Sequence, residues 1–63
     1  MTITKREAED AYIMYFACRR ECQKLADKIG WRWEDVFDLC DRIEDVKDIE
    51  AIWHDFGVEV IDG

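Results

Sequence analysis

Apolar residues recur every three or four positions through the first half of the chain. The run follows the segment from Thr4 to Glu7, a capping-box pattern in which the threonine oxygen accepts a backbone N–H and the glutamate reaches back. This period predicts one long amphipathic helix from about residue 5 to residue 29, ended by Gly30 in the left-handed conformation. The apolar stripe of this helix comprises Ala8, Ala11, Tyr15, Cys18, Cys22, Leu25 and Ile29.

The apolar positions of the second half lie on two different helical faces. At about 100° per residue, the set within residues 36–46 points about 120° away from the set within residues 49–56. We therefore predict a second helix that begins near Trp33, followed by a break between Glu44 and Asp48. A single bent helix through this region is the alternative.

A third helix is expected to begin at Asp45 or Asp48, whose side chains suit an N-cap, and to end at Gly57. The alternating residues 58–61 are typical of a short strand, and the first four residues are its candidate pairing partner. The predicted fold is mainly all-α. It is a compact three-helix domain over residues 1–63 with a long N-terminal helix, and the pattern allows a short C-terminal strand.

Size and composition narrow the function. A chain of 63 residues buries only about 60% of the surface that its unfolded form exposes, and most catalytic pockets need larger domains. The absence of serine excludes a serine nucleophile and a phosphopantetheine carrier. The longest apolar run, Ala11 to Cys18, is too short to span a membrane, and three cysteines favour reduced thiols in a cytoplasmic protein. We therefore expect no enzymatic activity and no cofactor.

The acidity of the chain is concentrated in its second half. The formal net charge is −7, of which residues 1–32 carry +2 and residues 33–63 carry −9. Carboxylates repeat every three or four positions from Glu34 onward, which places them on one flank of the second helix if that helix continues to Asp48. The candidate residues of this acidic flank are Glu34, Asp35, Asp38, Asp41, Asp45 and Asp48.

Two interpretations of the acidic flank remain open. It is either a solvated helix face, or a surface that binds a basic partner. Like charges at this spacing destabilise a helix, so their presence favours a function for the negative electrostatic field that they create. An acidic field repels nucleic acid and attracts basic protein surfaces. We expect a protein partner with a basic surface, in particular a nucleic-acid-binding protein, with no direct binding of nucleic acid and no membrane association.

Some apolar residues have no obvious place in the core. Ile13 and Phe16 lie opposite the stripe of the first helix, so they are either covered by the other helices or form an interface in a homodimer or with a foreign partner. Trp31 and Trp33 flank the turn after the first helix. They serve either as a lid on the core or as interface anchors, because tryptophan is frequent among binding hot spots.

The only candidate metal ligands are three thiols and one imidazole. Zinc accepts such a set, but the spacing differs from that of short zinc knuckles and each cysteine falls on a core stripe, so we predict no metal site. A nucleophilic pair of Cys40 and His54 is disfavoured because nothing suggests an oxyanion hole. The set comprises Cys18, Cys22, Cys40 and His54.

In size, acidity and compactness the chain resembles the small inhibitors carried by phages and mobile elements, including anti-CRISPR proteins, some of which resemble DNA in charge. This resemblance concerns gross properties and assigns no residue. It implies a non-enzymatic inhibitor or adaptor that occupies a basic nucleic-acid-binding groove by charge mimicry. The alternative is a homodimeric structural or regulatory module whose charge serves only solubility.

Overall fold

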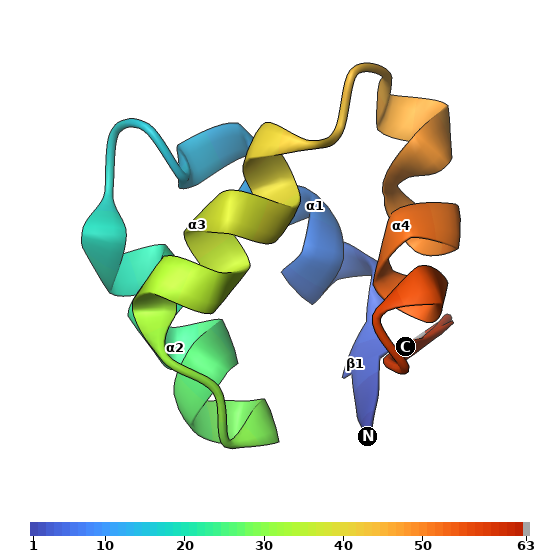
Figure 1. Cartoon of the computed structure of the whole chain (residues 1–63), viewed down its shortest axis with the longest axis horizontal. Coiled ribbons are helices and arrows are strands. Elements are labelled where there is room, and N and C mark those ends of the chain that lie inside the picture. The colour runs from blue at the N-terminus through green and yellow to red at the C-terminus, as the bar shows by residue number, and fades with distance from the viewer. Residues whose placement is uncertain (63) are drawn as a thin grey trace.

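The structure, a computed structural model, describes residues 1–62, and most of these residues are helical. The mainly α-helical prediction is therefore confirmed, together with the short C-terminal strand. In chain order the elements are β1 (Thr2–Thr4), α1 (Lys5–Met14), α2 (Arg19–Ile29), α3 (Trp33–Asp41), the 3-10 helix η1 (Val46–Asp48), α4 (Ile49–Asp55) and β2 (Glu59–Ile61) (Figure 1).

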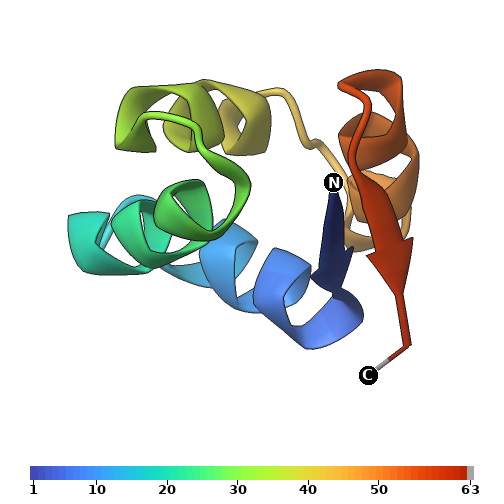
Figure 2. The ribbon, with the colours of Figure 1, turned by 90° about the horizontal axis from the view of Figure 1, so that it is seen from below.

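The two strands join the beginning of the chain to its end. They pair in parallel, with Ile3 opposite Val60, and the Glu59 N–H donates to the Met1 carbonyl at 2.9 Å. Figure 2 shows the strands side by side, with α4 next to them. The predicted pairing of the chain ends is thus confirmed. It is anchored by Ile3, whose side chain is completely buried.

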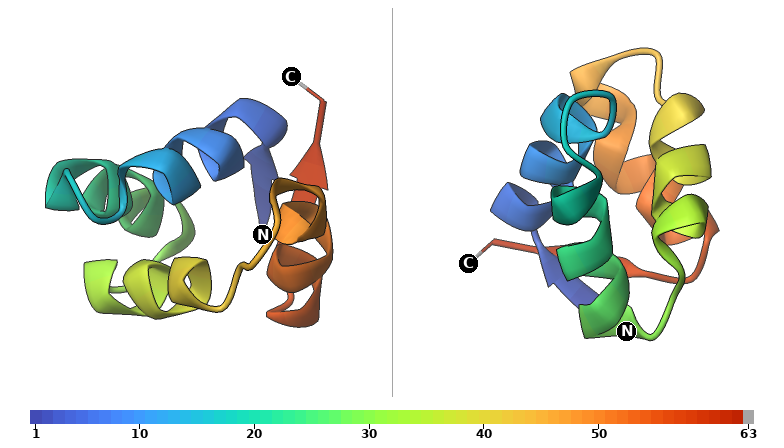
Figure 3. Two further views of the ribbon diagram at one scale, coloured as in Figure 1. Left: turned by 90° about the horizontal axis from the view of Figure 1, so that it is seen from above. Right: turned by 90° about the vertical axis from the view of Figure 1, so that its left-hand side faces the viewer.

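The predicted long N-terminal helix is wrong, because the chain leaves the helix after Met14 and starts a second one at Arg19. Residues 1–62 therefore form four α-helices instead of the predicted three. The N–H groups of Ala17 and Cys18 both donate to the Met14 carbonyl, at 3.0 and 2.7 Å, and Cys18 is extended. An unbroken helix of 25 residues would be about 37 Å long, whereas the longest dimension of the backbone is 24 Å. Figure 3 shows α1 and α2 on the same side of the fold, opposite α3. With the turn between them, apolar residues of both helices belong to one buried cluster.

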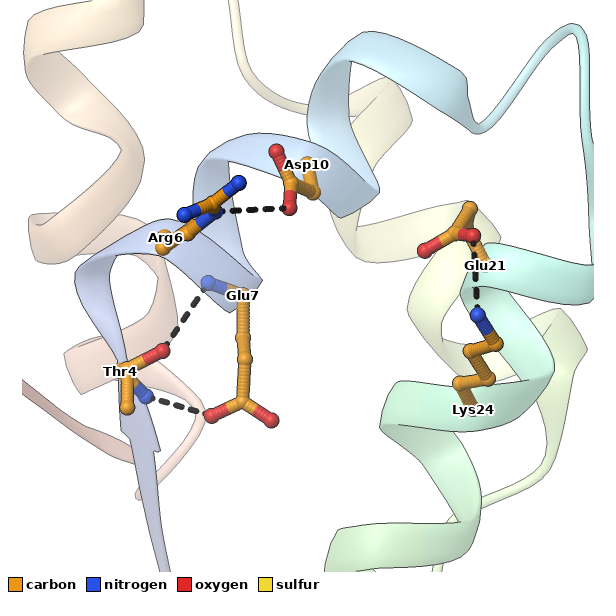
Figure 4. Close-up of polar contacts among 6 residues, drawn as sticks. All are labelled: Thr4, Arg6, Glu7, Asp10, Glu21 and Lys24. Atoms are coloured by element: carbon orange, nitrogen blue, oxygen red, sulfur yellow. Dashed lines mark hydrogen bonds and ion pairs between the residues drawn. The ribbon is translucent and has the colours of Figure 1, made fainter. Parts of the chain in front are cut away.

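The first helix begins where the capping box predicts. The Glu7 N–H donates to Thr4 Oγ1 at 3.1 Å, and the Thr4 N–H donates to Glu7 Oε1 at 2.8 Å (Figure 4). These bonds satisfy two N–H groups that would otherwise lack partners at the helix start.

The break predicted in the second half is present, so the single bent helix is wrong. Helix α3 ends at Asp41, and the segment that follows leads into η1. Asp45 Oδ1 accepts the Lys47 N–H at 3.1 Å and so caps η1, while Asp48 precedes α4 without a capping bond from its side chain. Two separate helices let both apolar faces reach the core.

The core lies between α1 and α2 on one side and α3 on the other, with α4 and the strands closing the end (Figures 2 and 3). Trp53 of α4 is its largest fully buried side chain. Within residues 1–62, none of the helices has both the length and the apolar character needed to cross a bilayer. The buried apolar residues are Ile3, Ala8, Ala11, Cys22, Leu25, Ala26, Ile29, Val36, Leu39, Cys40, Ile43, Ile49, Trp53 and Val58.

Candidate protein interface

The outer face of α3 carries a row of free carboxylates. Val36 and Leu39 turn inward, so Glu34, Asp38 and Asp41 project from the opposite face and are exposed. Within residues 1–62, these three side chains make no hydrogen bond and no ion pair shorter than 4.0 Å. They span about 10 Å, or one charge per about 5 Å, compared with about 3.4 Å along one DNA strand. We call these three residues the α3 ridge.

The acidic flank is shorter than its sequence spacing suggests. Its continuity depended on a helix that reaches Asp48, and α3 stops at Asp41. Asp45 lies in the connecting segment, where it caps η1 and pairs with Lys47 Nζ at 3.9 Å. The structure therefore groups Glu34, Asp35, Asp38 and Asp41 on one helix. It leaves Asp45 and Asp48 outside that helix.

One side of the ridge borders a small hollow of about 230 Å³, here called the tryptophan pocket. Trp31 and Phe56 supply its aromatic surface, with ring centroids 6.3 Å apart, and Asp35, Asp38 and Arg42 supply its polar surface. The guanidinium carbon of Arg42 lies 5.5 Å from the Phe56 ring centroid, within the range of a cation–π contact. The pocket thus combines apolar faces with two carboxylates.

Two helix ends place these aromatic rings together. The C-termini of α2 and α4 each close with a glycine at positive φ, 75° for Gly30 and 81° for Gly57. The Trp31 N–H then donates back to the Ala26 carbonyl at 2.9 Å, a Schellman bond that directs Trp31 over the core. There Trp31 stacks on buried Trp53 with centroids 5.6 Å apart. The lid role expected for Trp31 is therefore present, and part of its surface stays exposed.

The other side of the ridge borders an aromatic patch that comprises Tyr15, Phe16, Trp33 and Phe37. Phe37 makes edge-to-face contacts with its neighbours, with centroids 5.2 Å from Tyr15 and 6.3 Å from Trp33. Phe16 packs on Tyr15 at 4.6 Å, yet 78% of its surface is exposed. Tyr15, Trp33 and Phe37 are therefore partly buried, whereas the Phe16 ring is exposed on top of them.

Charged and apolar groups continue this patch. The Arg19 guanidinium lies 4.4 Å from the Trp33 ring centroid, a close cation–π contact. Ile13, on the last turn of α1, is 69% exposed. Burial and the nearby Asp41 carboxylate raise the pKa of the Tyr15 hydroxyl above its ordinary value. The turn at residues 15–18 leaves Ile13 and Phe16 uncovered.

The four candidate metal ligands do not form a site. Among residues 1–62, no group of three or more histidine, cysteine or carboxylate side chains lies close enough together to hold a metal ion. His54 is exposed on α4, whereas Cys22 and Cys40 are buried in the core. Burial raises the pKa of Cys22, and it raises the pKa of Cys40 to about 12. Protonated thiols of this kind are neither nucleophiles nor metal ligands.

The sequence pattern does not identify several residues of the interface. Phe37 belongs to α3 but lies between its buried and exposed faces, and Arg42 is one of only two basic residues after position 32. The apolar period places Phe56 on a core face, yet 42% of its surface is exposed. Arg42 could have been singled out in the sequence, because it is a basic residue within an acidic segment. Nothing in the spacing indicates that Phe56 meets Trp31.

Helix α3 thus presents an acidic ridge with aromatic surface on both sides. Tryptophan, tyrosine and arginine are the residue types most enriched at binding hot spots, and charges around them direct encounter. This arrangement suits a protein interface better than a catalytic centre. Comparison of the chain with protein-family models, with curated proteins and with solved structures finds no match.

Proposed function

We propose that this protein is a non-enzymatic protein-binding module whose α3 surface occupies a basic, nucleic-acid-binding groove of a partner. The observation that carries the proposal is the α3 ridge: three exposed carboxylates, unpaired within residues 1–62, with aromatic side chains on either side. Free carboxylates attract a basic groove at long range, and aromatic side chains supply contact area once the two surfaces meet.

The energetics of α3 support the same proposal. Asp38 and Asp41 are three positions apart and repel each other, and no base lies within the last turn of α3. Arg42, the C-cap residue, makes no ion pair shorter than 4.0 Å with either carboxylate within residues 1–62. A domain of this size has little stability to spare. Unrelieved repulsion on its surface is more readily understood if the charges bind a partner.

The biological role that we propose is that of an inhibitor, because the chain resembles phage-borne and mobile-element inhibitors, including anti-CRISPR proteins, in size and acidity. In this role the protein acts in the cytoplasm and competes with DNA or RNA for the basic groove. Its own affinity for nucleic acid is negligible because the net charge is −7.

The test is capture of partners from a source-cell extract on immobilised protein. Wild type should retain basic nucleic-acid-binding proteins, and both raised salt and added duplex DNA should release them. The double variant Asp38→Lys/Asp41→Lys should lose them. The control variant Asp10→Lys/Asp27→Lys makes the same charge change on α1 and α2 and should retain them. Retention that survives the α3 reversal, or that DNA does not disturb, would contradict the proposal.

A second candidate function follows from the exposed end of α1. Ile13 on the last turn of α1 and Phe16 in the turn that follows are 69% and 78% exposed. Such residues favour a homodimer, in which case the module is structural or regulatory and its acidity serves only solubility. Sedimentation of the protein over a range of concentrations distinguishes this function from a monomeric inhibitor.

A further inference from the structure

The tryptophan pocket has the size of a side chain rather than of a metabolite. Its volume of about 230 Å³ lies below the range of roughly 300 to 1,000 Å³ that drug-sized ligands occupy. A pocket of this size accommodates the end of one long side chain. The chemistry of its walls decides which side chain that is.

The walls are complementary to a planar cation. Trp31 and Phe56 offer aromatic faces, and Asp38 offers a carboxylate that is unpaired within residues 1–62. Asp35 uses Oδ2 to accept the Arg32 N–H at 3.1 Å, which leaves its other oxygen free. Aromatic faces bind cations through their quadrupole, and paired carboxylate oxygens match the fork of a guanidinium group.

Arg42 provides an independent observation of the same chemistry. Its guanidinium already lies over the Phe56 ring at 5.5 Å, at the edge of the pocket. The pocket therefore holds a guanidinium against an aromatic wall within this chain. Arginine stacks on aromatic rings and binds carboxylates in a bidentate manner, whereas lysine is a compact and strongly hydrated point charge.

We propose that the tryptophan pocket receives an arginine side chain of the partner, which packs on Trp31 and pairs with Asp38 and Asp35. This inference rests on the proposed function and names the chemistry by which the basic groove is recognised. Arg42 lines the same pocket, and its positive charge opposes the entry of a second guanidinium group, so its removal should favour binding of the partner's arginine.

The test is a titration of ¹⁵N-labelled full-length protein with the peptide acetyl-Gly-Arg-Gly-amide at constant ionic strength, followed by the indole N–H signals. The Trp31 signal should move and saturate with a dissociation constant on the order of 1 mM, as expected for one cation–π contact and one charged hydrogen bond. Trp33 lies in the aromatic patch across the ridge and should not move. The peptide with citrulline, which is uncharged, should not bind, and the lysine peptide should bind several-fold more weakly. Equal affinity for arginine and lysine would overturn the choice of arginine.

Variants separate the pocket from the net charge. Asp38→Asn should weaken arginine binding about tenfold. Arg42→Gln should strengthen it several-fold, while Arg20→Gln, with the same charge change on α2, should leave it unchanged. Equal effects of the two arginine variants would show that only net charge matters and would overturn the inference. Because these residues are exposed, the circular dichroism spectra of the variants should match that of wild type.

The two proposals fail separately. If the peptide does not move Trp31 but the α3 charge reversal still abolishes partner capture, the arginine inference is wrong and the proposed function stands. If the peptide binds at Trp31 but no captured protein depends on the α3 ridge, the pocket is a guanidinium site and the proposed function is wrong.

Discussion

A single carboxylate oxygen of Glu7 joins three parts of the fold. Oε1 of Glu7 accepts the Thr4 N–H at 2.8 Å and lies 2.6 Å from Lys28 Nζ, 21 positions later in the chain. The group that caps α1 is therefore also the group that ties α1 to the last turn of α2. The Lys28 bond, and next the Thr4 N–H, lower the pKa of Glu7 below its usual value near 4.5.

The Glu7–Lys28 pair predicts a pH-dependent contribution to stability. A lowered pKa in the folded state means that the contribution is present above the unfolded pKa and is lost as pH falls through the folded pKa. Because both side chains are partly exposed, we expect Lys28→Met to cost only about 0.5 kcal/mol at pH 7. This cost should shrink progressively as pH falls below the usual glutamate pKa of 4.5. Urea unfolding of both proteins across this pH range measures it, and a cost that does not vary with pH would contradict the assignment.

Gly30 is expected to be required for its backbone conformation alone. Its φ is 75°, and a Cβ at this position would meet no atom within 4 Å. Gly30→Ala should therefore destabilise the protein by about 1 kcal/mol through strain, without a steric clash. Gly30→Asn should cost less, since asparagine tolerates this region better. Thermal unfolding measures both, with about 4 to 8 °C expected per kcal/mol for a domain of this size. An alanine variant as stable as wild type would contradict this expectation.

Asp41→Lys should stabilise the isolated protein. The change removes the repulsion from Asp38 and places a positive charge at the C-terminal end of α3, where the helix dipole favours it. We expect a gain of about 0.5 kcal/mol in the free energy of unfolding at low salt, smaller at high salt. Asp41→Asn, which removes the charge without reversing it, should give about half of this gain. A destabilised lysine variant would show that Asp41 has a structural role.

Phe16→Asp should leave the fold unchanged and report on self-association. Although 78% of Phe16 is exposed, its ring packs on Tyr15 and Phe37, so the free energy of unfolding should fall by about 1 kcal/mol. If the exposed end of α1 forms a homodimer, sedimentation should show a dimer for wild type and a monomer for the variant. Identical sedimentation of the two proteins would exclude a dimer through this face.

The three cysteines should differ in reactivity. Cys18 is partly exposed in the turn between α1 and α2, whereas Cys22 and Cys40 are buried with raised pKa values, about 12 for Cys40. Iodoacetamide at about pH 8, near the ordinary thiol pKa, should therefore label one cysteine, Cys18, in the native protein and all three in urea. Mass spectrometry counts the labels, and rapid native labelling of Cys40 would contradict its burial.

Features that depend on neighbours a few positions apart could be predicted from the sequence. The Thr4–Glu7 capping box, the glycine ends at Gly30 and Gly57 and the break before Asp48 are local, because each is set by short-range hydrogen bonds or by the period of apolar residues. The concentration of acid in the second half is likewise a property of the sequence.

The end of the first helix and the grouping of side chains in the interface depend instead on tertiary packing. The apolar period runs through residues 15–18 without a proline or glycine. The chain turns there because Ala8 and Ala11 of α1 can then be buried in the same core as Leu25 and Ile29 of α2, which a straight rod of about 37 Å would keep apart. That turn exposes Phe16. The contact of Trp31 with Phe56 and Arg42 likewise depends on how α2, α3 and α4 pack. This packing is set by the burial of apolar surface across the whole domain, which the spacing of neighbouring residues does not determine.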